Sequence, residues 1–184
     1  MHISNDRRRI LESFGRSPAL LSAALRHFPR KMWLYKPSAE RWSIHEIILH
    51  LADSEAGAYI LCRHFIAQPG SAPVEFDPAL WAESLGYFHQ STREAIEIIR
   101  RLRRMTYQLL VTLPDHVWSH SILDAKKGEI RLERWIELQE QHIPHHLAQM
   151  HETYNIWLER NPPRKAAPLG RTNSGQRSLS AIAC

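Results

Sequence analysis

Two histidines in the segment QHIPHHLAQ have the spacing that a metal-binding helix uses. His142 and His146 are four residues apart, so on a helix with about 100° per residue their side chains lie about 40° apart. Two imidazoles on one helix face can reach the same ion. His145 points to the other side of that face, and we expect it at the surface or behind the ligands.

A bundle metal site needs a third ligand from a facing helix, and His50 is the best candidate. It flanks the apolar stripe of the segment WSIHEIILHLADS, where leucine or alanine would be ordinary. His45 lies about 140° away around that helix, so we expect it to face solvent. Three neutral imidazoles would leave positions on a metal open to water or substrate, as in catalytic sites. A hydrogen-bonded core histidine is the commoner role of each residue alone, and H-x-x-x-H lacks the glutamate of zinc-protease helices.

Helix-start signals locate the elements that carry these histidines. An S-x-x-E capping box at 43–46 predicts a helix that runs to about residue 68, and a second box at 91–94 predicts one that Pro114 ends. Ser17 followed by Pro18 predicts an N-cap with proline at the first helical position, and this helix ends near Pro29.

A last helix is predicted from about residue 132 to 158, and Pro144 within it should bend it because proline removes a helix hydrogen bond. A loop from Pro69 to Pro78 precedes a short helical turn through Trp81. Residues 117–132 alternate around Lys126-Lys127-Gly128, which indicates a hairpin or a looped connection. Four amphipathic helices predict an all-α, antiparallel four-helix bundle.

The charge is concentrated at one end of the chain. A length of 184 residues predicts one domain, over residues 1–160, and residues 161–184 resemble a basic disordered tail without an apolar period. Arg160 and the tail carry the whole net charge of +5, since no acid follows Glu159. A neutral body argues against nucleic-acid binding, because phosphate binding needs a basic face. The RRLRR cluster at 100–104 is predicted to be a solvated face balanced by Glu94 and Glu97.

The cysteine count and the hydropathy of the sequence indicate where in the cell the protein is expected. No run approaches the ~20 apolar residues of a membrane helix, and no apolar signal region follows the first charges, so we expect no membrane association and a cytoplasmic location. Cys62 and Cys184 are too few for a disulfide framework or a cysteine-rich zinc module. Cys62 lies on an apolar stripe and is expected in the core.

Taken together, these motifs resemble the DinB/YfiT-like superfamily over about residues 10–158. Residues 42–54 are similar to its second-helix motif, and residues 142–149 are similar to its last-helix motif. The resemblance implies a four-helix bundle, commonly a homodimer, with one divalent metal ion held by His50, His142 and His146. Three imidazoles suit zinc, nickel, iron or copper, and we expect zinc, nickel or iron.

Relatives of this family include thiol-dependent transferases and isomerases, and others that are named only as metal-dependent hydrolases. The resemblance therefore implies a metal-dependent enzyme acting on a small-molecule substrate. It would activate either water, for hydrolysis, or an exogenous low-molecular-weight thiol, for S-transfer. The alternative is a non-catalytic metal-binding stress-response or interaction protein.

Several further residues are compatible with either a functional or a purely structural role. Asp53 and Gln149 each lie one turn from a histidine and could orient ligands or substrate, although a solvent-facing side chain is the commoner reading of both. Phe76, Trp81 and Tyr87 could wall a small-molecule pocket or could pack in the core.

Overall fold

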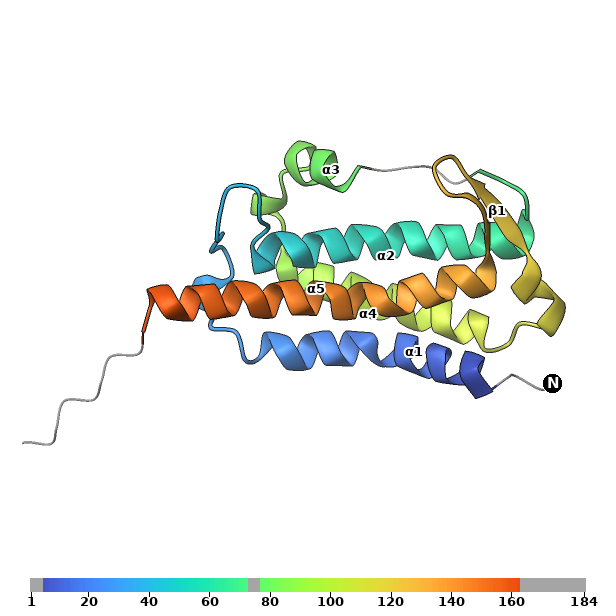
Figure 1. The fold of residues 1–184 in the computed structure, drawn as a ribbon, viewed down its shortest axis with the longest axis horizontal. Coiled ribbons are helices and arrows are strands. Elements are labelled where there is room, and N and C mark those ends of the chain that lie inside the picture. Colours follow the sequence, from blue (N-terminus) through green and yellow to red (C-terminus); the bar gives the residue numbers. More distant parts are fainter. Residues whose placement is uncertain (1–4, 73–76, 163–184) are drawn as a thin grey trace, which may run out of the picture.

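Four long helices lie alongside one another in the computed structural model, which describes residues 5–72 and 77–162 (Figure 1). They are α1 (Asn5–Leu25), α2 (Ile44–Ala67), α4 (Thr92–Leu110) and α5 (Leu132–Arg160). The shorter elements are η1 (Arg30–Met32), α3 (Pro78–Ser84), η2 (Tyr87–His89), η3 (Asp115–Ser119), β1 (Ser121–Asp124) and β2 (Gly128–Arg131). The predicted four-helix bundle is confirmed. Most of the predicted tail, from residue 163 onward, lies outside the described residues.

The helices form two parallel pairs that pack against each other in opposite directions (Figure 1). Early α1 meets early α5 through Ser13 and Glu140, and the segment after α1 meets later α5 through Phe28 and His151. The connection that contains α3 and η2 carries the chain back along α2, so that α2 and α4 run in the same direction. The antiparallel relation therefore holds between α2 and α5, the two helices that carry the site histidines.

The predicted start of the first helix is wrong, because α1 begins at Asn5 and passes through Pro18. Proline cannot donate to the carbonyl four residues before it, which here belongs to Phe14. The hydroxyl of Ser17 donates to that carbonyl instead, at 2.8 Å. Ser17 is thus a buried hydrogen-bond donor inside the helix and not its N-cap.

The other start signals are confirmed. Ser43 and Glu46 form the complete capping box of α2, and the Ser91 hydroxyl accepts from the Glu94 amide at the start of α4. The short helical turn predicted through Trp81 is α3, in which the amides of Ala79 and Leu80 donate to the Asp77 carboxylate. These caps satisfy amides that have no partner within their helix, which fixes where each helix begins.

The predicted hairpin is the antiparallel pair β1 and β2, which joins η3 to α5. Gly128 begins β2 with a φ of 73°, a conformation that favours glycine. Helix α5 continues through Pro144 without interruption. Within residues 5–72 and 77–162, no helix has both the length and the apolar character needed to cross a bilayer.

The interpretation of residues 100–104 as a solvated face is wrong at one position. Arg100 and Arg101 are exposed and lie near Glu97, as predicted. Arg103 is completely buried and forms a two-point ion pair with Glu55 of α2. The apolar stripe of α2 is interrupted at Glu55 because that carboxylate pairs with an arginine from α4.

Candidate metal centre

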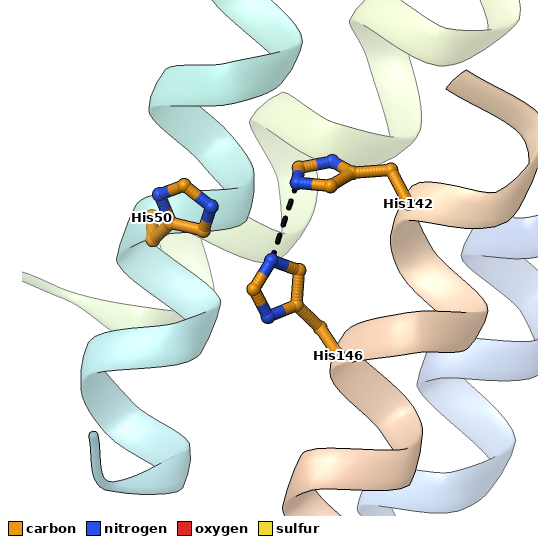
Figure 2. A group of neighbouring side chains, drawn as sticks. All are labelled: His50, His142 and His146. Carbon is orange, nitrogen blue, oxygen red and sulfur yellow. Dashed lines mark hydrogen bonds between the residues drawn. The ribbon is translucent and has the colours of Figure 1, made fainter. Parts of the chain in front are cut away.

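The three predicted histidines meet between α2 and α5 (Figure 2). His50 comes from α2, and His142 and His146 come from successive turns of α5. One ring nitrogen of each lies within 4.8 Å of the others. His50 and His146 are only 5% and 7% exposed, and His142 is half-buried, so the cluster lies inside the bundle.

Burial keeps these imidazoles neutral. It lowers the pKa of His50 to about 4 and that of His142 to about 3, and neighbouring histidines add to both shifts. Burial also lowers the pKa of His146, partly opposed by its hydrogen bond to Gln149. A neutral imidazole keeps one nitrogen lone pair, which is the form that binds a metal.

Hydrogen bonds determine which nitrogen of His146 faces the cluster. Its Nδ1 lies 2.8 Å from Oε1 of Gln149, and Nε2 of the same amide lies 3.0 Å from Nε2 of His145. If the amide NH₂ donates to His145, its oxygen accepts from Nδ1 of His146. The lone pair of His146 is then on Nε2, which lies 3.2 Å from Nε2 of His142.

The ring of His50 presents Nε2 to the other two histidines (Figure 2). Nδ1 of His50 is buried and has no hydrogen-bond partner among the described residues, while Nε2 of the same ring lies 3.4 Å from the Ser54 hydroxyl. The unpaired Nδ1 is on the side of the ring turned away from His142 and His146, so it is not the nitrogen that faces the cluster. A donor set of three imidazole nitrogens fits a divalent transition metal.

Packing fixes the rings around the cluster. The ring of Trp42 lies against that of His50, with centroids 4.8 Å apart. Arg103 bonds Glu55 of α2 and the carbonyl of Gln139 on α5, one turn before His142. One signal for this ion pair was present in the sequence, the single charged residue Glu55 in the apolar stripe of α2, but no local pattern identified Arg103 as its partner.

Other residues that the sequence singled out lie around the centre in different roles. His45 is half-buried and its Nε2 lies 2.8 Å from the carbonyl of Tyr87, so the expectation that it faces solvent is wrong. His145 is exposed, as predicted. Asp53 is half-buried and accepts from the Tyr87 hydroxyl at 2.5 Å, and does not join the histidines. Cys62 is in the core, where burial raises the pKa of its thiol to about 12.

Two hollows flank the centre. A hollow of about 330 Å³ is lined by His146, Gln149 and the ion pair of Arg41 with Glu152. A second, of about 410 Å³, runs along α2 and is walled by Trp81. Of the three aromatic residues named as wall candidates, Trp81 takes this role, Tyr87 is in the core, and Phe76 lies outside the described residues.

A protein of known structure shares this fold. The structure is similar to that of YfiT from Bacillus subtilis, described as "a probable metal-dependent hydrolase with an unusual four-helix bundle topology". The TM-score is 0.76 at 22% sequence identity, over 87% of this chain and 90% of that one, which shows a common fold.

The sequence comparisons agree with this fold. A protein of Oceanobacillus iheyensis named "Putative metal-dependent hydrolase" is 27% identical over 107 residues, which are 58% of this chain and 62% of the relative. The match thus spans less than two thirds of that relative's length. Residues 13–150 match the DinB superfamily. The chain therefore belongs to the DinB superfamily.

Proposed function

We propose that this protein is a metal-dependent hydrolase that holds one divalent ion with His50, His142 and His146. The observation that carries the proposal is the meeting of three neutral imidazole nitrogens, within 4.8 Å, from two helices of the bundle. The names of the two similar proteins support the same activity. Zinc, nickel and iron all suit three imidazole ligands.

A divalent ion at this position would supply Lewis acidity and lower the pKa of a bound water from 15.7 toward ~7. The chain's own residues prepare the site for it. Gln149 holds the His146 ring with Nε2 toward the cluster, and Trp42 covers one side of His50. Burial keeps all three rings free of protons that would compete with the ion.

We favour hydrolysis over S-transfer because hydrolysis needs only water as its nucleophile, whereas S-transfer needs a thiol. In hydrolysis of an ester, the water oxygen bonds to the carbonyl carbon, the bond to the leaving oxygen breaks, and the released alkoxide takes the proton that the water loses. Cys62 cannot supply a thiolate, since it is buried and its pKa is raised to about 12. Because no other cysteine lies among the described residues, S-transfer would need an exogenous low-molecular-weight thiol.

The test compares metal-stripped protein with protein reloaded with zinc, nickel or iron(II), using p-nitrophenyl acetate as the probe. We expect hydrolysis to disappear on chelation, to return with at least one metal, and to be lost in His146→Ala. His116→Ala is the matched control, because His116 is exposed on η3. Hydrolysis that survives chelation would contradict the proposal.

A parallel assay separates the alternatives. Chlorodinitrobenzene with 2-mercaptoethanol tests S-transfer, and we expect no metal-dependent consumption of it. Metal binding without turnover in either assay would instead support the non-catalytic metal-binding protein. The homodimer implied by the family resemblance and the cytoplasmic location expected from the sequence remain predictions.

A further inference from the structure

We propose that the groove along α2 beside the metal centre receives the body of the substrate, and that the substrate is an uncharged, largely apolar small molecule. This inference rests on the proposed hydrolase function, because it names the class of molecule on which that centre acts. It is carried by the position of the groove, by its lining and by its size.

The groove lies about one helical turn from His50 and His142, although none of the three histidines lines it. Ser54 lines it, and the hydroxyl of Ser54 lies 3.4 Å from Nε2 of His50. Gln139 lines the facing side and precedes His142 by three residues on α5. From there the groove follows α2 away from the histidines and is walled by Trp81 of α3. A molecule lying in it would therefore have one end about one helical turn from His50 and His142.

The lining of the groove is apolar along the part of α2 that lies farther from the histidines. The α2 surface contributes Ala56, Gly57, Ile60 and Leu61, and Ile60 is exposed although it is a large apolar residue. Such surface is stabilised by contact with apolar groups at about 25 cal/mol per Å² removed from water. The lining thus favours an aliphatic or aromatic body.

Two polar side chains of the lining, Asp53 and His64, already have partners. Asp53 accepts from the Tyr87 hydroxyl at 2.5 Å, and Nδ1 of His64 lies 3.0 Å from the Ser71 hydroxyl. Among residues 5–72 and 77–162, no lysine or arginine lines the groove to attract an anion, and the Asp53 carboxylate in its lining would repel one. An uncharged ligand therefore fits this surface better than an anionic one.

The dimensions exclude larger partners. A volume of about 410 Å³ is in the range of sites for small molecules. Gly57 lies inside α2, where glycine costs about 1 kcal/mol relative to alanine. Gly57 is exposed in the groove lining, and because it has no side chain the groove stays open there.

A charged substrate would fit the other hollow better. That hollow, beside His146, contains Arg41 and Glu152, which pair with each other at 2.6 Å. Opening this pair would free charges of both signs for a ligand. The two hollows thus predict opposite charge preferences, which makes the choice between them measurable.

The first experiment measures binding of the neutral fluorescent probe N-phenyl-naphthylamine to metal-stripped protein, so that it does not depend on catalysis. Gly57→Leu should weaken binding at least about tenfold, because the added side chain occupies the groove. Leucine is also a better helix former than glycine, so loss of folding would not explain the result. Ala148→Leu, at an exposed site on α5 outside the groove lining, should bind as the wild type does. Equal binding by Gly57→Leu and the wild type would overturn the proposal.

The second experiment uses metal-loaded protein and p-nitrophenyl esters from acetate to hexanoate. In the wild type, kcat/KM should rise by up to about fourfold per added methylene that becomes buried. Gly57→Leu and Trp81→Ala should flatten the rise, whereas Phe88→Ala, which removes an aromatic side chain 66% exposed on η2, should keep it. A flat wild-type series, or a preference for the anionic hemisuccinate ester, would overturn the groove proposal. No hydrolysis of any ester, with probe binding intact, would instead refute the hydrolase function.

Discussion

Gln149 selects the nitrogen that His146 turns toward the histidine cluster. Its amide bridges His145 and His146, so only Nε2 of His146 is left to face the cluster. Partners of this kind set the tautomer and orientation of a metal-binding imidazole. We predict that Gln149→Leu lowers the affinity for zinc by about 10- to 100-fold. A competition titration against a chromophoric chelator measures this directly.

The control for this variant is Gln141→Leu, which removes the same side chain from an exposed position on the same helix. It should bind zinc as the wild type does. If Gln149→Leu also kept wild-type affinity, Gln149 would have no positioning role, even if the histidines are the ligands.

At the residue scale, the sequence predicted the histidines better than their surroundings. The i, i+4 spacing of His142 and His146 defines one helix face whatever the tertiary structure. The environment of His45 could not be read in the same way, because its partner is a carbonyl of Tyr87, 42 residues later. The unpaired Nδ1 of His50 is likewise a property of packing that no local pattern records.

The ion pair of Arg103 with Glu55 links the helices that carry the site. Arg103 of α4 bonds Glu55 of α2 and the Gln139 carbonyl of α5, and its guanidinium lies over the Phe14 ring of α1. We predict that Arg103→Met lowers the free energy of unfolding by about 3–5 kcal/mol, because it leaves a buried carboxylate without its partner. Urea denaturation of the metal-stripped protein would measure the loss.

The double variant Arg103→Met with Glu55→Leu tests that reason. Removing both charges should recover much of the lost stability, since an apolar pair of similar volume avoids the cost of burying ions. A double variant that is less stable than Arg103→Met alone would show that the ion pair is not the cause.

At the element scale, the sequence located helices by their capping residues and failed where one pattern has two meanings. The capping box at Ser43 allows one reading, and α2 begins there. Ser17-Pro18 is compatible with a helix start or with a helix interior in which serine bonds the carbonyl that proline leaves free. The structure has the second arrangement, which depends on apolar residues of α1 before Pro18, such as Leu11 and Phe14, being buried in the bundle.

The whole molecule loses stability in acid because it buries neutral imidazoles. The pKa of His50 is about 4 and that of His142 about 3 in the folded protein, against about 6.5 in an unfolded chain. Between these values the unfolded chain binds more protons, so stability rises with pH. The contribution of these histidines is fully present above pH ~6.5 and is lost as the pH falls toward 4.

We therefore predict that the melting temperature of metal-stripped protein falls between pH ~6.5 and ~4, and that His50→Leu shows a smaller fall. Differential scanning calorimetry in matched buffers measures both. The same pH dependence in His50→Leu and the wild type would show that His50 does not titrate on unfolding.

The arrangement of the whole bundle was only partly predictable. Helical periodicity predicted four long helices, but not that the connection through α3 returns the chain so that α2 and α4 run in the same direction. Which helices become neighbours depends on contacts between distant residues, such as Glu55 with Arg103. The family resemblance, and not periodicity, implied that His50 and the α5 histidines belong to one centre.

The most direct test of the metal centre is the metal content of protein purified without a metal-affinity tag, measured by elemental analysis. We predict about one divalent ion per chain in the wild type and in His116→Ala, and a loss of that ion in both His50→Ala and His146→Ala. Circular dichroism of each variant would show that the helices remain. A wild type that stays metal-free after incubation with zinc, nickel or iron(II), or alanine variants that keep the ion, would contradict the account.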